Sequence, residues 1–208
     1  MIDKSFFSTV FDAVLALSGW EVVAASLGIA YILLATKESQ WCWPMAFIST
    51  LIYTVLFWEG QLPMQALLNL YYMAMAIYGF LLWRQHGSDK NSTLSISKFT
   101  WYQQLLFLLF GSGITFLVAN YLQSIDGSQR PYLDAGVMVF SMLNTYLMAR
   151  KVLQNWLYWI VIDMAAIMLY SQTGFYATVA LFSVYVVLAF IGYGKWMKHY
   201  YQQQYSEA

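Results

Sequence analysis

The amino-acid sequence predicts an all-α polytopic membrane protein with about seven transmembrane helices. Hydrophobic residues make up 61% of its 208 residues and charged residues only 10%, whereas a soluble domain is roughly 25% charged. Apolar segments close to the ~20 residues that a membrane span requires recur along the chain, separated by short polar breaks. Most Lys and Arg residues fall into alternate breaks, which is the pattern of cytoplasmic loops.

Composition also limits the classes of function. The formal net charge is zero, so we expect no nucleic-acid partner. The single cysteine, Cys42, excludes an internal disulfide and a multi-cysteine metal site. The two histidines, His86 and His199, lie outside the predicted spans, and no Walker-type glycine loop is present. We therefore expect no metal, no cofactor and no enzymatic activity.

The first half of the chain predicts a short leading segment and a unit of three spans. Residues 1–18 contain Ser5–Leu17, an apolar stretch that is short and interrupted by Asp12. This stretch predicts an interfacial helix or pre-helix rather than an eighth span. Residues 19–84 form the first three-helix unit. Its predicted spans are Trp20–Thr36, Trp41–Trp58 and Pro63–Trp83.

A polar linker and one linking span separate this unit from a second one. Residues 85–98 are rich in Gly, Ser, Asp, Asn and Lys, which predicts a cytoplasmic linker. Residues 99–130 contain the linking transmembrane helix, Phe99–Leu122, and a loop. A second three-helix unit at 131–197 and a cytoplasmic tail at 198–208 complete the chain. The spans of the second unit are Tyr132–Ala149, Trp156–Tyr170 and Phe175–Trp196.

The distribution of basic residues predicts the orientation of the chain. With seven spans, eight of the ten Lys and Arg residues fall on one side, which the positive-inside rule assigns to the cytoplasm. Only Lys4 and Arg130 fall on the other side. We therefore expect the N-terminus outside and the C-terminus in the cytoplasm. The eight cytoplasmic residues are Lys37, Arg84, Lys90, Lys98, Arg150, Lys151, Lys195 and Lys198.

The two three-helix units resemble each other in sequence. Because one span links them, both units have the same orientation, and the similarity predicts a parallel internal repeat with a site near the midplane. Chance similarity between apolar helices is the alternative. Three glycines, Gly79, Gly192 and Gly194, predict close approach between helices. The matched pairs are Lys37 with Lys151, Gln40 with Gln154, Gly60 with Gly174 and Tyr71 with Tyr185, at 114 residues, and Gly79 with Gly192 and Trp83 with Trp196, at 113 residues.

The segment that begins the sixth span carries the clearest candidate site. Trp156, Trp159 and Asp163 are spaced i, i+3 and i+7, so they lie on one face of a helix. An acid deep in a span costs about 2.5–3.5 kcal/mol on insertion scales, so it normally faces a cavity or a partner. Two indoles beside a carboxylate suit a flat aromatic cation. The alternative is that the tryptophans belong to the aromatic belt and Asp163 holds neighbouring helices together.

Other residues within the spans are candidates to complete this site. Trp41 lies 115 residues before Trp156, and Ser49 lies 114 residues before Asp163, so the first unit repeats the stripe without its acid. The amides could read hydrogen-bonding groups on a ligand, or they could cross-link helices. The aromatic residues could wall the site or belong to the belt. The candidates are Gln65, Asn69 and Asn144 among the amides, and Trp41, Trp43 and Tyr72 among the aromatic residues.

The stripe Trp156-x-x-Trp159-x-x-x-Asp163 resembles the WxxWxxxN/D motif of the Pnu-type bacterial vitamin transporters, the PnuC family. The similarity extends over roughly residues 20 to 197. It implies a duplicated three-helix unit with a linking helix, related to the SWEET sugar transporters, in the bacterial inner membrane. It also implies uptake by facilitated diffusion, with a cytoplasmic kinase that traps the product, and a possible homotrimer.

The resemblance leaves the substrate open between two flat aromatic cations. Asp163 at the last motif position, and the segment Glu38-Ser39-x-Trp41-Cys42-Trp43-Pro44, look more like the thiamine-transporting PnuT branch. We therefore expect thiamine, with nicotinamide riboside as the alternative. Two further alternatives are a membrane scaffold subunit that transports nothing and a SWEET-like sugar carrier.

Overall fold

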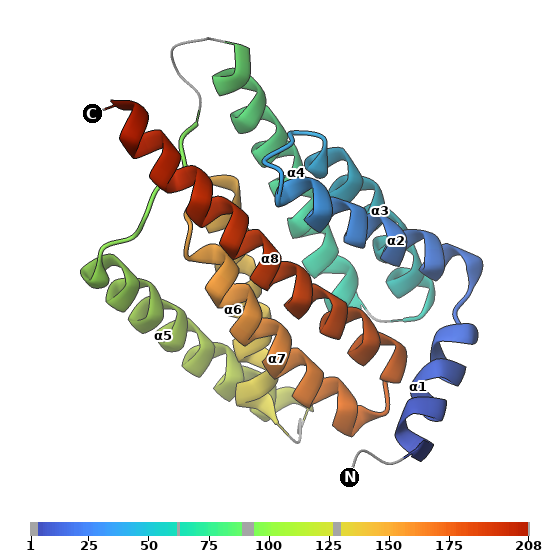
Figure 1. Ribbon diagram of the computed structural model, residues 1–208. Helices are drawn as coiled ribbons and strands as arrows, with labels where there is room; N and C mark the ends of the chain where they lie inside the picture. The colour runs from blue at the N-terminus through green and yellow to red at the C-terminus, as the bar shows by residue number, and fades with distance from the viewer. Residues whose placement is uncertain (1–3, 62, 89–93, 127–129, 208) are drawn as a thin grey trace.

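The computed structural model describes residues 4–61, 63–88, 94–126 and 130–207, and folds them into eight α-helices (Figure 1). The prediction of an all-α chain is confirmed. In these residues the only β-structure is an isolated parallel bridge between Ser97 and Val152. The helices are α1 (Lys4–Leu15), α2 (Gly19–Ala35), α3 (Cys42–Glu59), α4 (Pro63–Ser88), α5 (Trp101–Asp126), α6 (Pro131–Ala149), α7 (Asn155–Thr173) and α8 (Tyr176–Glu207).

Local sequence signals position several helix ends. Ser18 and Glu21 form a capping box at the start of α2, in which each backbone N–H donates to the other's side chain, at 2.7 and 3.3 Å. Pro131 occupies the first turn of α6, where its missing N–H leaves no donor unpaired. Gly174 ends α7 with a φ of 81°, a left-handed conformation that glycine adopts without strain.

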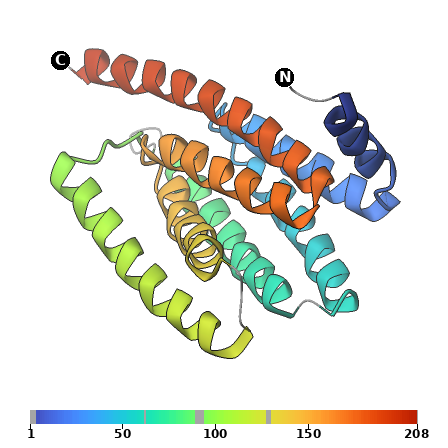
Figure 2. The same cartoon turned by 90° about the horizontal axis from the view of Figure 1, so that it is seen from below.

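The long helices pack as two groups of three. α2 packs against α3 and α3 against α4, while α6 packs against α7 and α7 against α8. The two groups meet where α4 contacts α6 and where α2 contacts α8, so the last helix of each group touches the first helix of the other. α5 packs on α6 at the edge of the molecule, and α1 lies against α8 (Figures 1 and 2). The two groups therefore share one interior.

Within the described ranges, four helices, α3, α4, α5 and α8, are long and apolar enough to cross a membrane. α1 and α2 would supply a fifth span if they were continuous, but they bend by 108° at their junction. α2 has only 17 residues, and α6 and α7 carry polar side chains, such as Asn144 and Asp163, that are buried inside the bundle. Polar groups that are buried inside the bundle are not exposed to lipid, so they do not prevent α6 and α7 from crossing a membrane. The count of seven spans stays a prediction.

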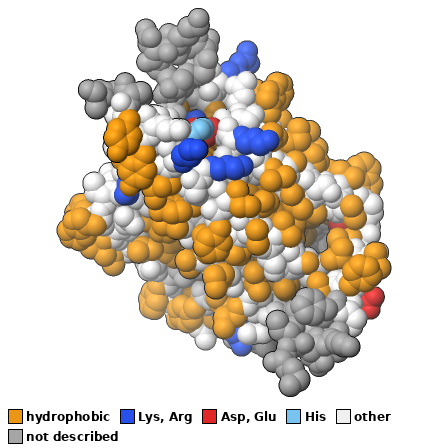
Figure 3. Space-filling view, in the orientation of Figure 1, with side chains coloured by type: hydrophobic (Ala, Val, Ile, Leu, Met, Phe, Trp, Pro, Cys, Tyr) orange, Lys and Arg blue, Asp and Glu red, His pale blue; other side chains and the backbone are white. Residues whose placement is uncertain are grey.

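The outer surface carries the apolar side chains that contact with lipid requires. Hydrophobic side chains cover much of the face in Figure 3, whereas most of the visible Lys and Arg side chains gather at one end of the molecule. The peripheral helix α5 exposes Leu106, Leu109, Phe110 and Leu117. A continuous apolar surface of this kind is typical of a membrane interaction site.

Two predicted boundaries differ from the structure. α4 continues to Ser88 and α8 to Glu207, so the predicted linker begins inside α4, and the described part of the predicted tail is helical. No Pro or Gly occurs between Lys195 and Glu207, so no helix-breaking residue interrupts the polar end of α8. Residues 89–93 of the predicted linker lie outside the described residues.

The second part of the predicted linker is bound to the turn between α6 and α7. The Ser97 N–H donates to the Lys151 carbonyl at 3.0 Å, and the Leu153 N–H donates to the Ser97 carbonyl at 2.8 Å. The Gln154 amide pairs with the backbone of Phe99, accepting its N–H at 2.9 Å and donating to its carbonyl at 3.0 Å. This stretch is therefore hydrogen-bonded to the helix bundle and buries Ile96, while Ser95, Ser97 and Lys98 stay exposed.

The same packing unit occurs in both groups of helices. A tryptophan at the start of the middle helix lies against a glycine of the third helix, and it meets a second tryptophan of that helix edge to face, at 5.4 Å between ring centroids in both groups. Gly194 differs, because an added Cβ there would have no neighbour within 4 Å. The corresponding residues are Trp43, Gly79 and Trp83 in the first group and Trp156, Gly192 and Trp196 in the second, each pair 113 residues apart.

Candidate functional site

A cavity of about 340 Å³ lies between the two groups of helices. Side chains of α2, α3, α4, α6, α7 and α8 line it, and among the described residues α1 and α5 contribute none. Its wall is mainly aromatic, with several hydroxyl groups, one amide and one carboxyl group. This volume and this mixture of groups are typical of small-molecule sites, which range over about 300–1,000 Å³.

The predicted stripe of α7 faces this cavity. Trp156, Trp159 and Asp163 all line it, because their spacing places them on the inner face of the helix. Trp156 is 1% exposed and Asp163 is 3% exposed. The Nε1 atom of Trp156 is buried without a hydrogen-bond partner among the described residues. The stripe therefore offers two aromatic surfaces, a donor and a carboxylate to one cavity.

Among the described residues, Asp163 is the only charged side chain of the cavity wall. Within the described part of the chain it has neither a hydrogen-bond nor an ion-pair partner. Tyr72 and Tyr185 line the same cavity as Asp163. A buried carboxylate without a counter-charge is unfavourable, and a cation beside it stabilises it. The geometry therefore suits a ligand that brings its own positive charge.

The first group of helices supplies three of the predicted residues to the cavity wall. Trp43 occupies the position equivalent to Trp156, is 1% exposed, and also has an unpartnered Nε1. Asn69 donates from Nδ2 to the Gln65 carbonyl at 2.9 Å, so its own carbonyl oxygen stays available as an acceptor. Tyr72 lines the cavity beside Ser141 of α6.

Three other predicted residues lie away from the cavity. Trp41 is 59% exposed at the start of α3, and Gln65 is exposed on α4. Asn144 is fully buried, but it donates from Nδ2 to the Asn155 carbonyl at 2.9 Å and so joins α6 to α7. The predicted correspondence of Trp41 with Trp156 is wrong, since Trp43 has the matching contacts.

Several cavity residues were missed because their types are common in packed helices. Tyr31 of α2 and Tyr170 of α7 line the cavity, but single tyrosines carry no signal in a chain that contains 17 of them. Ser141, Thr145 and Met148 of α6 also line it. Their i, i+4 and i+7 spacing marks one helix face, so the argument applied to α7 would also have found this second stripe.

Comparison with known proteins places the chain in a family. The family model described as nicotinamide mononucleotide transporter matches residues 18–198. The chain belongs to this family. It is 26% identical over 179 residues to the riboflavin/roseoflavin transporter RibM of Streptomyces davaonensis, with 85% of this chain and 83% of RibM covered. It is also 26% identical over 199 residues to the nicotinamide riboside transporter PnuC of Escherichia coli K12, with 84% and 82% covered.

The fold of this nicotinamide mononucleotide transporter family member is also similar to a solved structure. It matches the crystal structure of the vitamin B3 transporter PnuC with a TM-score of 0.74 and 22% identity, covering 95% of this chain and 90% of that one. The resemblance to the PnuC family is therefore confirmed at the level of family and fold. The named relatives give no support to the thiamine-transporting branch.

Proposed function

We propose that this protein is a passive carrier for uptake of a small cationic vitamin, and that its substrate is nicotinamide riboside. The observation that carries the proposal is the unpaired Asp163 beside Trp156 and Trp159 in a cavity of small-molecule size. The carboxylate supplies the counter-charge of a pyridinium ring, and the indoles supply stacking and cation–π attraction. Asn69, Trp43 and Tyr72 complete the wall of the site.

The choice among vitamins rests on charge and on the relatives. Riboflavin has no positive charge to pair with Asp163, whereas nicotinamide riboside and thiamine both have one. The sequence resemblance favours thiamine, through Asp163 together with the segment from Glu38 to Pro44. The relatives favour nicotinamide riboside, which PnuC of Escherichia coli transports according to its name. We therefore rank nicotinamide riboside first and keep thiamine as the second candidate.

The proposed transport cycle follows from the arrangement of the helices. In this proposal α2–α4 and α6–α8 are the two repeat units, α5 is the linking helix, and one unit moves against the other to open the site to each side in turn. The apolar helices and the bacterial relatives support a multi-pass location in the inner membrane. The end of the molecule that carries Lys37, Lys151, Lys195 and Lys198, called the lysine-rich end, would face the cytoplasm. Phosphorylation by a cytoplasmic kinase would keep the vitamin inside, and assembly as a homotrimer is a further part of the proposal.

Calorimetric titration of the detergent-purified protein tests the substrate. We expect saturable binding of nicotinamide riboside, weaker binding of thiamine, and the weakest binding of riboflavin, because only the first two bring a positive charge to Asp163. Tight binding of thiamine alone would overturn the substrate. If none of the three binds or raises the melting temperature, the carrier function is contradicted and a scaffold role is favoured, since a ligand stabilises only a fold that it binds.

Replacing Gly28 by Ala should narrow the cavity without unfolding the protein. A Cβ at Gly28 would overlap the hydroxyl end of Tyr185, a ring that can swing towards the cavity. We expect the Kd of the bound vitamin to rise about tenfold, which corresponds to about 1.4 kcal/mol. The melting temperature without ligand should stay within a few degrees of wild type. Calorimetry and thermal unfolding measure the two quantities.

Gly136→Ala is the matched control for this substitution. An added Cβ at Gly136 would make only an ordinary contact at 3.7 Å with Thr115 of α5, outside the cavity wall. It should leave the Kd unchanged. Equal affinity in Gly28→Ala and wild type would contradict a ligand position beside Tyr185.

A further inference from the structure

Four tryptophans close one end of the cavity. Trp43 and Trp156 line the cavity, and Trp83 and Trp196 lie behind them, outside its wall. Successive ring centroids are 5.4 Å apart from Trp43 to Trp83, 6.3 Å from Trp83 to Trp196, and 5.4 Å from Trp196 to Trp156. All four side chains are at most 5% exposed. We call this cluster the tryptophan plug.

The plug lies at the lysine-rich end of the molecule. Along α3 the cavity wall runs from Trp43 to Phe57, which is about 21 Å of helix at 1.5 Å per residue. The cavity therefore extends almost to the C-terminal end of α3, at Glu59, whereas at the N-terminal end of α3 it stops at the plug residue Trp43. The four indoles therefore lie between the end of the cavity at Trp43 and Trp156 and the turns that carry Glu38 and Lys151.

Two hydrogen bonds hold the plug across the boundary between the helix groups. Trp83 of the first group donates from Nε1 to the carbonyl of Ala149 in the second group, at 2.9 Å. Trp196 of the second group donates from Nε1 to the carbonyl of Ala35 in the first group, at 3.0 Å. Both acceptors are the last residues of their helices, α6 and α2. Each group thus anchors the plug residue of the other.

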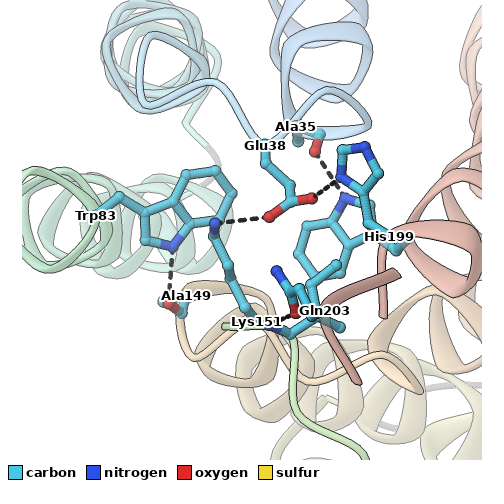
Figure 4. A network of polar contacts seen from close by, with 9 residues as sticks. Ala35, Glu38, Trp83, Ala149, Lys151, His199 and Gln203 are labelled. Carbon is cyan, nitrogen blue, oxygen red and sulfur yellow. Dashed lines mark hydrogen bonds and ion pairs between the residues drawn. The ribbon is translucent and has the colours of Figure 1, made fainter. Parts of the chain in front are cut away.

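An ion pair between the groups covers the plug (Figure 4). Lys151 Nζ lies 2.8 Å from Glu38 Oε2, and the two side chains are only 11% and 13% exposed. The Lys151 ammonium also lies 4.8 Å from the centroid of the Trp83 ring, which adds a cation–π contact. His199 of α8 contacts the other oxygen of Glu38, with 2.6 Å between Nδ1 and Oε1.

The two partners of the ion pair hold equivalent positions in the two groups. Glu38 follows α2 with a φ of 54°, and Lys151 follows α6 with a φ of 51°. Both values are in the left-handed region, which is unusual for residues other than glycine and persists only where the surrounding structure requires it. The turns after the first helix of each group therefore meet face to face, with opposite charges at the matching residue.

We infer that the Glu38–Lys151 ion pair and the tryptophan plug form the gate through which substrate leaves towards the lysine-rich side. This inference rests on the proposed carrier function. Opening the cavity at this end requires the turns after α2 and α6 to separate, because the ion pair and both indole hydrogen bonds join one helix group to the other. Loss of either charge removes the pair and makes separation easier.

The gate can be tested by the accessibility of a cysteine placed behind it. Ala46 lines the cavity on α3, so Ala46→Cys in a Cys42→Ala background places a thiol there. A cationic, membrane-impermeant methanethiosulfonate is applied from the lysine-rich side, in inside-out vesicles. We expect Glu38→Gln and Lys151→Gln each to raise the labelling rate at least about tenfold. The double variant Glu38→Lys/Lys151→Glu should restore slow labelling, because the two positions are equivalent.

Several comparisons make this result specific. A change in surface potential alone would move the rates of Glu38→Gln and Lys151→Gln in opposite directions, since one removes a negative and the other a positive charge. Lys37→Gln, next to Glu38 but exposed and outside the pair, should label at the parental rate. Parental rates in both single variants, or fast labelling in Lys37→Gln, would overturn the gate.

The same reporter separates failure of the gate from failure of the proposed function. Nicotinamide riboside or thiamine added to the parental protein should protect the cysteine at residue 46 if the cavity binds it. The rates in the charge variants need no substrate. If the vitamin does not protect the cysteine but the charge variants label faster, the proposed substrate is contradicted and the gate is supported. If the vitamin protects the cysteine but the charge variants label at the parental rate, the gate is contradicted and the substrate is supported. Variants are compared at melting temperatures close to the parental one.

Discussion

Asp163→Ala should weaken binding of the cationic vitamin at least about 30-fold. Truncating one partner of a buried charge pair costs about 2–5 kcal/mol, and about 2 kcal/mol corresponds to about 30-fold in Kd. The ligand-free protein should melt at the wild-type temperature or above, because Asp163 has no partner among the described residues to lose. Calorimetry and thermal unfolding with and without ligand measure both effects.

Asp163→Asn separates the two roles open to this side chain. Asn keeps an acceptor oxygen of the same size but loses the negative charge. If the negative charge binds the vitamin, Asp163→Asn should lose nearly as much affinity as Asp163→Ala. If the acceptor oxygen binds it, Asp163→Asn should retain most of the wild-type affinity. Wild-type affinity in Asp163→Ala would remove Asp163 from the site. A fall in the ligand-free melting temperature would contradict the unpaired state of the carboxylate.

The helical class and the α7 stripe could be predicted because both depend on local patterns. Apolar segments of span length identify helices without any knowledge of packing. The i, i+3, i+7 spacing of Trp156, Trp159 and Asp163 fixes their common face whichever neighbour they meet. The face of an isolated polar residue is not fixed in this way. Gln65 and Asn69 are four residues apart, yet Gln65 is exposed and Asn69 lines the cavity.

The sequence predicts a similarity between the two helix groups, but residue types alone misplace its register. The turn after α2 has one residue more than the turn after α6, so the offset changes from 114 for Ala35 and Ala149 to 113 for Glu38 and Lys151. Pairing Lys37 with Lys151 because both are lysines hides this change of offset. The residue equivalent to Lys151 is Glu38, which has the opposite charge and the same left-handed backbone conformation.

Amides present a different difficulty, because their chemistry is the same in a site and in a core. Asn144 was a candidate either for ligand contact or for cross-linking helices, and it is fully buried and bonded to the backbone of Asn155 at 2.9 Å. Nothing in the sequence distinguishes this use from recognition of a vitamin. The distinction depends on which element packs opposite the side chain, and that is a tertiary property.

Gly79→Ala and Gly192→Ala should both destabilise the protein and impair the site. A Cβ at Gly79 would overlap the Trp43 ring, and one at Gly192 would lie 2.6 Å from the Trp156 ring. Each indole is 1% exposed and packs edge to face on a second tryptophan, so it can yield only by breaking that contact and moving into the cavity. Overpacking of this kind costs about 1–3 kcal/mol, which exceeds the gain of up to about 1 kcal/mol that Ala brings to a helix. Thermal unfolding measures the loss.

Gly194→Ala is the control, since it lies on the same helix as Gly192 and an added Cβ there meets nothing within 4 Å. It should melt at or above the wild-type temperature, because only the gain in helix propensity remains.

Gly79 and Gly192 make equivalent contacts, so Gly79→Ala and Gly192→Ala should lower the melting temperature by similar amounts. Both variants should also bind the vitamin more weakly, because Trp43 and Trp156 line the same cavity. A large fall in melting temperature in only one of the two variants would mean that Trp43 and Trp156 can move by different amounts despite their equivalent packing. Stability in all three variants equal to wild type would contradict the close approach of indole and glycine on which both the plug and the cavity wall depend.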